Sequence, residues 1–190
     1  LVDRVDVSHF RLSIHLIIAF LIITLILWNF LNLKIKKNLH EKLNYYIPVL
    51  FLIFIYGQII IGAFVSGMDA GQIYNSWPLM GNSYFPDDNE IINIFKLSAF
   101  SEPSLVQFFH RNLAYVILVF YLFILIKIYK KKLRNLYVPI NVVGLFLIIQ
   151  IFLGILTLIF GAQIYIASMH QISSIFLVSS SVYFLFLNSN

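Results

Sequence analysis

Five long apolar runs divide the chain, and polar segments separate them. The runs cover roughly residues 10–33, 45–66, 104–128, 136–160 and 164–187. Each is close to or above the length of about 20 residues that an α-helix needs to cross the hydrocarbon core of a bilayer. The pattern therefore predicts an all-α, polytopic membrane protein whose bundle contains five transmembrane helices.

The composition agrees with a membrane location. The chain is 61% hydrophobic and 11% charged, whereas soluble domains are about half apolar and about a quarter charged. It contains no cysteine, which excludes disulfides and thiolate metal sites. The net charge of +5 does not indicate nucleic-acid binding, because the basic residues cluster beside apolar runs, as they do in membrane proteins.

The charged residues predict the orientation of the helices. Seven of the eight acids lie on one side, and nine of the thirteen basic residues lie on the other, in the connections after the first and third runs. These nine are Lys34, Lys36, Lys37, Lys42, Lys127, Lys130, Lys131, Lys132 and Arg134. The positive-inside rule places them in the cytoplasm or the mitochondrial matrix. We therefore expect a protein of the bacterial plasma membrane or the mitochondrial inner membrane, with the N-terminus outside and the C-terminus inside.

One long connection, at 67–103, lies on the outer side. Loops of this length are uncommon unless they are functional or disordered. Two interpretations stay open: the loop lies on the membrane surface, as its Trp and Tyr residues favour, or it forms a lid over a site. We expect Gly67 and Gly71 to mark sharp turns of the backbone and Asp69 to be a solvated turn residue.

A weak internal repeat suggests two units. Gln58 and Gly62 in the second run match Gln150 and Gly154 in the fourth, and the first and last runs each carry an early histidine. Such repeats build pseudo-symmetric bundles whose interface carries the site. We therefore expect residues 1–44 to be the last helix of an N-terminal repeat with an inner basic loop, and 45–190 to be a C-terminal four-helix repeat. Three helices of the first repeat would then precede Leu1.

Three histidines lie inside predicted spans, where ionisable residues are costly and usually functional. His15, His110 and His170 lie 17 to 19 residues from the inner boundary of their runs, which places all three roughly 25 to 29 Å above the inner face. Each is followed four residues later by a small side chain, namely Ala19, Ala114 and Ser174. Because positions i and i+4 share a helix face, this spacing leaves room for a large planar ligand; close helix packing is the other explanation.

His110 and His170 are predicted on parallel helices at equal depth, which favours one haem held by two axial imidazoles. A buried structural histidine pair and a non-haem metal remain as alternatives. Arg111 is expected at the outer interface, where it pairs with a haem propionate or extends to lipid headgroups. His9 and His40 lie in or beside polar segments, and we expect them to be solvated.

Several motifs along the whole chain resemble the haem A synthase family, and the closer match is to its alphaproteobacterial and mitochondrial branch. The loop motifs are the most specific part of the resemblance. The matching strings are Arg11-Leu-Ser-Ile-His15, Gly62-Ala-Phe-Val-Ser-Gly-Met-Asp-Ala-Gly71, Tyr74-Asn-Ser-Trp-Pro-Leu-Met80, Val106-Gln-Phe-Phe-His-Arg111 and His170-Gln171.

The resemblance implies an eight-helix bundle of two four-helix halves, of which this chain would be the fourth to eighth helices. It implies that His110 and His170 ligate a haem b and that His15 is a ligand of the substrate haem O. Members oxidise the C8 methyl of haem O to a formyl group, which gives haem A for cytochrome oxidase. The essential carboxylate is expected in a first outer loop outside this chain, so catalysis by this chain alone is uncertain.

The implied partners are haem O, membrane lipid, and haem O synthase or cytochrome oxidase assembly factors; the electron donor stays open. Two other functions are possible from the sequence. A membrane b-type cytochrome would only transfer electrons, and it would need no loop over a substrate site. A transporter is suggested only by the repeat and the glycines, and the lack of a membrane-embedded acid disfavours it.

Overall fold

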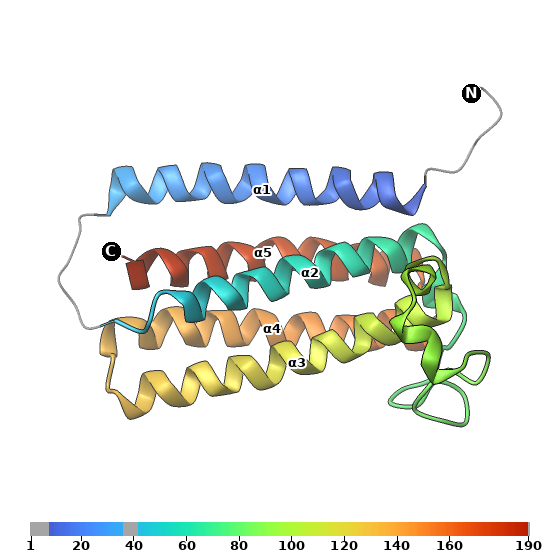
Figure 1. The fold of residues 1–190 in the computed structure, drawn as a ribbon. Coiled ribbons are helices and arrows are strands. Elements are labelled where there is room, and N and C mark those ends of the chain that lie inside the picture. Colours follow the sequence, from blue (N-terminus) through green and yellow to red (C-terminus); the bar gives the residue numbers. More distant parts are fainter. Residues whose placement is uncertain (1–7, 36–41, 190) are drawn as a thin grey trace, which may run out of the picture.

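The computed structural model describes residues 8–35 and 42–189, and within them the structure is helical without β-strands. The long helices are α1 (His9–Lys34), α2 (Tyr46–Gly67), α3 (Pro103–Lys130), α4 (Tyr137–Ile159) and α5 (Ile164–Ser189) (Figure 1). The short 3-10 helices are η1 (Ala70–Gln72), η2 (Ile91–Phe95), η3 (Leu97–Ser101) and η4 (Arg134–Leu136).

All five long helices are long and apolar enough to cross a membrane. Each begins and ends within two residues of the span that the sequence predicts, so the all-α, five-span prediction is confirmed. A bilayer forces backbone groups to bond within their own segment, which makes a long apolar run helical. Pro103 begins α3, where its fixed φ and missing N–H suit the first helical position.

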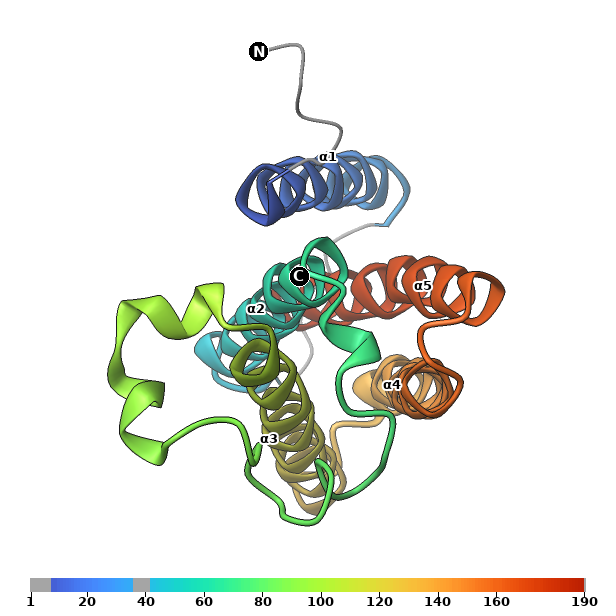
Figure 2. The same ribbon diagram turned by 90° about the vertical axis from the view of Figure 1, so that its right-hand side faces the viewer.

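Helices α2 to α5 form a ring in which each helix packs on its neighbour in sequence and α5 closes against α2. Helices α3 and α5 therefore lie diagonally across the ring. Helix α1 lies outside it, against α2 and α5 (Figures 1 and 2). The assignment of α1 to a separate repeat, with a boundary near residue 44, stays a prediction.

The hydrophobic core lies in the half of the ring nearer the basic helix ends; we call this the inner half and the opposite one the outer half, after the predicted orientation. All buried residues of α4 lie between Pro139 and Leu147, and all those of α5 lie at or after Ser173. The inner ends are also joined by polar contacts, since Leu43 N donates to Asn188 Oδ1 at 2.8 Å and Asn188 Nδ2 donates to the Leu43 carbonyl at 3.2 Å. The outer half is less closely packed, and this half contains His110 and His170.

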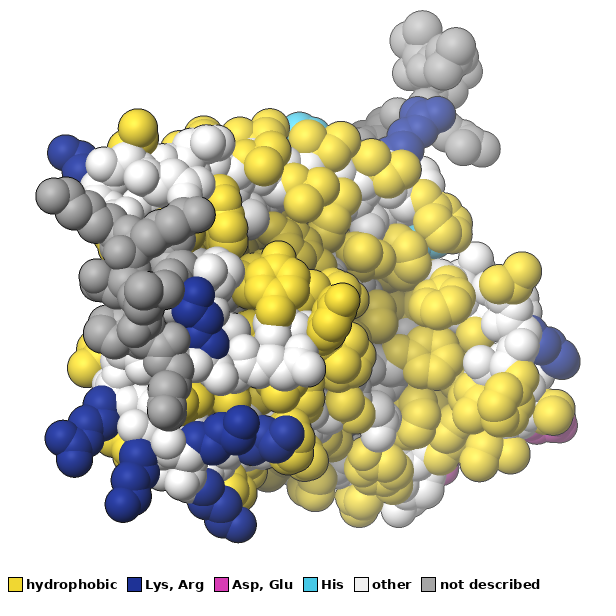
Figure 3. Space-filling view, turned by 60° about the vertical axis from the view of Figure 1, so that its left-hand side comes forward, with side chains coloured by type: hydrophobic (Ala, Val, Ile, Leu, Met, Phe, Trp, Pro, Cys, Tyr) yellow, Lys and Arg dark blue, Asp and Glu magenta, His cyan; other side chains and the backbone are white. Residues whose placement is uncertain are grey.

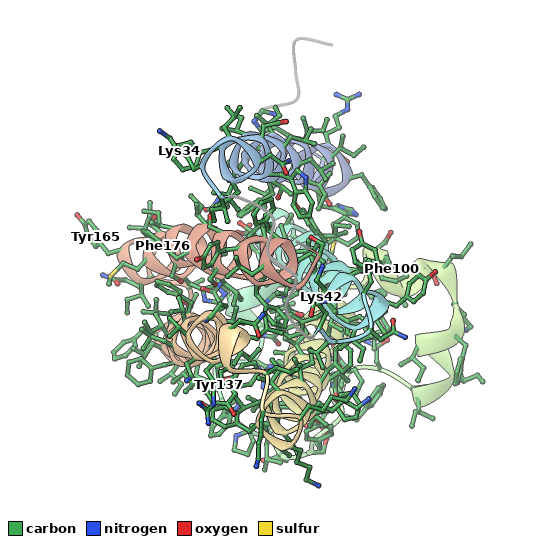
Figure 4. All side chains as sticks on the ribbon, turned by 90° about the vertical axis from the view of Figure 1, so that its left-hand side faces the viewer. Lys34, Lys42, Phe100, Tyr137, Tyr165 and Phe176 are labelled. Atoms are coloured by element: carbon green, nitrogen blue, oxygen red, sulfur yellow. The ribbon has the colours of Figure 1, made fainter. Side chains whose placement is uncertain are left out.

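The charges separate along the helix axes. On the face shown in Figure 3, Lys and Arg gather at the end where α1 ends and α3 turns into α4, Asp and Glu show at the opposite end, and hydrophobic side chains fill the middle. Lys42 is labelled at the basic end in Figure 4. Lys36 and Lys37, part of the predicted inner cluster, lie outside the described residues. This distribution is typical of a multi-pass membrane protein.

Helices α1 and α2 make a close contact at Gly67. A Cβ at Gly67 would lie 2.9 Å from the His9 Cα, so only glycine allows this contact. The His9 ring packs edge-on against Phe64 at 5.3 Å, and its Nε2 is buried. The expectation that His9 is solvated is therefore wrong, because α1 starts early enough to bring this residue onto α2. His40 lies outside the described residues.

The turn after α2 differs in one detail from the expectation. Asp69, with φ of 50°, adopts the left-handed conformation, which Asp tolerates better than most residues, whereas neither Gly67 nor Gly71 has a positive φ. Gly71 instead lets the loop pass close to the α4–α5 turn, since a Cβ at Gly71 would lie 3.4 Å from the Ala162 Cβ. Asp69 itself is exposed, as expected.

Candidate functional site

The three histidines singled out in the sequence lie at the same depth. His15 comes six residues after the start of α1, His110 seven after the start of α3, and His170 six after the start of α5. At the α-helical rise these positions are about 10 Å from the outer helix ends. The structure thus places all three in one layer along the helix axes, and two of them, His110 and His170, lie in the outer half of the ring.

His110 is held by α2, the helix before it. The side chain of Gln58 donates from Nε2 to the His110 backbone carbonyl at 3.0 Å, and the same Nε2 lies 3.3 Å from His110 Nε2. The imidazole lies against Gly62, where a Cβ would approach His110 Cε1 to 3.0 Å. Gln58 and Gly62 can both reach this residue because they are one turn apart on the same face of α2.

His170 has the same surroundings on the other side of the ring. Gln150 Nε2 donates to the His170 carbonyl at 3.0 Å, and a Cβ at Gly154 would approach His170 Cε1 to 3.1 Å. Ser173 adds a further contact: its hydroxyl donates to Gln150 Oε1, and its oxygen also lies 2.9 Å from the His170 carbonyl oxygen. The helical hairpins α2–α3 and α4–α5 therefore carry one arrangement twice.

Around the depth of the histidines, few side chains of α3, α4 and α5 are buried. Every residue of α3 from 108 to 115 is half-buried, although the residues directly before them are buried. In α4, no residue after Leu147 is buried, and in α5 none before Ser173 is. Interiors of membrane bundles are normally as closely packed as soluble cores. The low burial of α3, α4 and α5 at this depth is compatible with a bulky planar group between α3 and α5.

The donor set fits haem better than a bare metal ion. In the described residues no group of three or more His, Asp or Glu side chains could hold a metal. His110 and His170 each have a buried Nδ1 for which the described part of the chain supplies no hydrogen-bond partner. Two imidazoles, on diagonal helices and at one depth, match the axial ligands of a haem iron.

His15 is not brought into this site. Its side chain is exposed on α1, on the face that also carries the exposed Ile18, Ile22 and Leu25. That face points away from α2 and α5, which contact α1 through residues such as Phe20, Thr24 and Trp28. His15 therefore shares the depth of the other two histidines and faces away from them.

Arg111 fastens the outer loop to α3. Its Nη1 donates to the carbonyls of Ser76 at 2.9 Å and Leu79 at 3.2 Å, and its Nη2 donates to the Tyr74 carbonyl at 2.9 Å. Gln107, one turn earlier, donates to the same Tyr74 carbonyl at 3.1 Å. The buried Nε of Arg111 finds no acceptor in the described part of the chain. The structure thus gives Arg111 a role that the sequence did not suggest.

Further contacts hold the first part of the loop over the outer end of the bundle. Trp77 Nε1 donates to Tyr115 Oη at 3.0 Å, and Tyr84 Oη donates to Asn112 Oδ1 at 2.7 Å. At the other side of the ring, Asn75 Nδ2 donates to the carbonyl of residue 158, near the end of α4, at 2.9 Å. This part of the loop runs from α2 across to α4 (Figure 2). It has the position of a lid.

Tyr74 is the loop residue whose carbonyl binds both Gln107 and Arg111 of α3. Its hydroxyl donates to Asp88 Oδ1 at 3.1 Å. Burial and the neighbouring Asp88 carboxylate raise the pKa of the Tyr74 phenol, so the hydroxyl stays protonated over the physiological pH range and keeps donating this hydrogen bond.

The later part of the loop, η2 and η3, projects sideways from the bundle (Figure 2). It exposes large apolar side chains, with Phe95 80% and Leu97 90% exposed. Phe100, labelled in Figure 4, joins this segment to the bundle, since its ring lies 6.2 Å from Phe64 and 5.6 Å from Phe109. The two interpretations of the loop thus fit different parts of it: the first part has the position of a lid, and the second has the apolar surface expected at a membrane interface.

Sequence reasoning noticed Gln58, Gly62, Gln150 and Gly154 only as a repeat and gave them no role in the site. The available signal was their spacing, because a glutamine and a glycine four residues apart share one helix face. The lid contacts of Tyr115 and Asn112 were missed altogether. Their signal is weaker: both are polar residues near one end of an apolar helix, where Asn112 follows Arg111 directly and Tyr115 lies one turn after it.

The family model and the similar curated proteins point to one family. The family model described as cytochrome oxidase assembly protein, COX15-CtaA, matches residues 1–182. The haem A synthase of Pelagibacter ubique strain HTCC1062 is 44% identical over 194 residues, which cover 100% of this chain and 56% of that protein. The haem A synthase of Wolbachia pipientis wMel is 38% identical over 97% of this chain and 52% of its own length. No solved structure matches the chain.

The haem A synthase of Flavobacterium johnsoniae is 36% identical over 96% of the chain and 55% of its own length. The chain therefore spans about half the length of the curated relatives it matches.

Proposed function

This chain belongs to the COX15-CtaA family of cytochrome oxidase assembly proteins, and we propose that it forms a haem-holding half of a haem A synthase. The similar proteins of Pelagibacter and Wolbachia carry that name. Because the chain spans about half of their length, the activity of the complete enzyme belongs to the proposal. That activity is the oxidation of the C8 methyl of haem O to a formyl group, which yields haem A.

The duplicated histidine site is the observation that carries this proposal. His110 and His170 lie at one depth on the diagonal helices α3 and α5, and each imidazole rests against a glycine of the preceding helix. In our proposal the two imidazoles hold the iron of a haem b, which supplies electron-transfer chemistry when bound. The chain's own contribution is to position the porphyrin and to exclude water through the lid.

Arg111 and the lid would act at the propionate edge of the haem. The enclosed Nε of Arg111 and the remaining N–H of its Nη2 are free to bind a carboxylate while the loop carbonyls occupy the other donors. Arg111 would then hold the lid and the haem together. His15, on the opposite face of α1, would bind haem O in a second site that this chain shares with the remainder of the enzyme.

The alternative function is a b-type cytochrome that only transfers electrons. The lid favours the synthase, because a carrier that leaves its haem unaltered needs no ordered cover at the outer end of the bundle. The partners implied for the synthase are haem O, membrane lipid, and haem O synthase or other assembly factors of cytochrome oxidase.

The test of the proposed function is production of haem A. The chain would be expressed in a bacterium that lacks its own haem A synthase, either alone or joined to the part of the Pelagibacter relative that it does not cover. Extracted haems would be separated by chromatography. We expect haem A from the joined protein, and none from the same protein with His110→Ala. Haem b in the purified protein without any haem A would instead favour the electron-transfer cytochrome.

The proposal includes an orientation, with the lid outside and the α3–α4 turn in the cytoplasm or matrix. The chain has no cysteine, so single cysteines can report the sidedness of exposed positions. We expect Asn82→Cys to react with a membrane-impermeant maleimide in intact cells, and Lys131→Cys to react only after permeabilisation, because the basic clusters remain on the inner side. Labelling in the reverse pattern would refute the orientation.

A further inference from the structure

We infer that Gln58 and Gln150 are positioning residues that fix the orientations of the two histidine ligands. Each acts together with the glycine one turn later, Gly62 or Gly154. This inference rests on the proposed function, since it assigns a role within the haem site.

Each glutamine binds the backbone of a histidine on the next helix. The donor–acceptor distance is 3.0 Å in both hairpins, from Gln58 to His110 and from Gln150 to His170. A primary amide inside a membrane bundle is costly without a partner. A helix carbonyl already accepts one hydrogen bond from residue i+4 and has a second lone pair available. The glutamine uses this lone pair and thereby fixes the level of the histidine relative to the neighbouring helix.

The glycine one turn later restricts the ring of the same histidine. The Cβ that any other residue would add lies 3.0 Å from Cε1 at Gly62 and 3.1 Å from Cε1 at Gly154. The imidazole therefore packs directly on helix backbone, which leaves it little freedom to rotate. Backbone and ring are constrained by residues of one helix face, so the plane of each imidazole is defined by the protein.

The two hairpins differ in how the glutamine amide is held. In α5, the Ser173 hydroxyl donates to Gln150 Oε1, so both ends of that amide are engaged. The equivalent position in α3, three residues after the histidine, is Leu113. Gln58 Oε1 is accordingly buried without a partner in the described part of the chain. The glutamine of the α4–α5 hairpin is therefore the more rigidly held of the two.

The orientation of the two imidazoles affects the electronic structure of the haem. The g values of a low-spin ferric haem with two imidazole ligands depend on the angle between the imidazole planes, and partners of the axial ligands tune its reduction potential. Loss of either glutamine removes the bond that holds the histidine backbone against the neighbouring helix, so the histidine can shift and its ring can tilt against the glycine. Since both ligands remain, the haem should still bind, but with altered spectra. A glutamine that merely stabilised the fold would not change the g values of the haem that remains bound.

The experiment compares Gln58→Leu and Gln150→Leu with the control Gln171→Leu. Gln171 is exposed and adjacent to His170, so the control makes the same substitution at the same depth outside the site. Purified full chains would be measured for haem affinity, for the g values of the ferric haem and for its midpoint potential. For the two test variants we expect haem affinity about tenfold lower, as for other lost partners of ligands, together with shifted g values and a shifted potential. The control should match the wild type.

Ser173→Ala keeps the inference testable if Gln150→Leu fails to fold. It removes the donor to Gln150 Oε1 and leaves the amide itself in place, so the g values should shift in the same direction by a smaller amount. Circular dichroism and gel filtration would establish that each variant is folded. Folded glutamine variants with wild-type g values and potential would overturn the inference while the proposed function stands. A wild-type chain that binds no haem would overturn both.

Discussion

Replacing His110 or His170 by alanine is expected to remove haem from the purified chain. Each imidazole would supply one of the two axial bonds to the iron, so either substitution removes half of the axial ligation. We expect the haem content per polypeptide, measured as the pyridine haemochrome, to fall to about a tenth of the wild-type value or less, the order expected when metal affinity drops by about 10–100-fold. The sharp α band of the reduced protein should disappear with it.

His15→Ala is the matched control for this experiment. His15 lies at the same depth as the other two histidines but is exposed on the face of α1 turned away from the ring. In the chain by itself this substitution should leave the haem b content unchanged. In the protein joined to the remainder of its relative, it should abolish haem A production, because a substrate porphyrin without its ligand loses its orientation. Loss of haem b from the isolated variant would show that His15 belongs to the same site.

Gly62→Ala and Gly154→Ala are expected to have the next largest effect. The added methyl would approach an imidazole Cε1 to 3.0 or 3.1 Å, which is closer than van der Waals contact. The ring has to move away, and haem affinity should fall about tenfold, since displaced ligands cost as much as lost partners. The measurement is an optical titration of the haem-depleted chain with haem.

Gly57→Ala on α2 separates this effect from general changes in the helix. A Cβ there would lie 3.6 Å from Leu113 Cδ2, an ordinary contact. Alanine is also the better helix former by about 1 kcal/mol, so a loss at Gly62 cannot come from a weakened helix. We expect Gly57→Ala to keep wild-type haem affinity. Equal affinities for Gly57→Ala and Gly62→Ala would contradict the assigned role of the close contact.

Much of the fold could be predicted from the sequence because the membrane imposes simple rules on it. A long apolar run has to become a helix, since its backbone groups find no partners in lipid. The predicted bounds of the five helices therefore lie within two residues of the observed ones. Depth followed from counting along a helix of constant rise, which put His15, His110 and His170 in one layer. The motif resemblance was also read from the sequence alone, and the family match over residues 1–182 confirms it.

The contacts between helices could not be predicted in this way. His9 was expected in solvent, yet it packs on Phe64 because α1 lies against α2. Arg111 was expected to bind a propionate or lipid, and in the structure it binds carbonyls of the lid, whose path depends on where α2 and α4 end. These contacts depend on how the helices pack against one another, and the hydropathy pattern of a single helix does not predict that packing.

The sequence by itself thus determined the number, limits and class of the helices, the separation of charge along the bundle, and the residues that share a depth. It did so because these properties depend on local periodicity and on the energy of placing each residue in lipid or water. Only the tertiary structure decided which side of its helix each histidine presents to the neighbouring helices. His110 and His170 are turned into the ring and His15 away from it, because the packing of each helix on its neighbours selects the face that it buries. The same packing places Gln58 and Gln150 against the histidine carbonyls, a contact fixed by a few ångströms between helices rather than by any spacing within one.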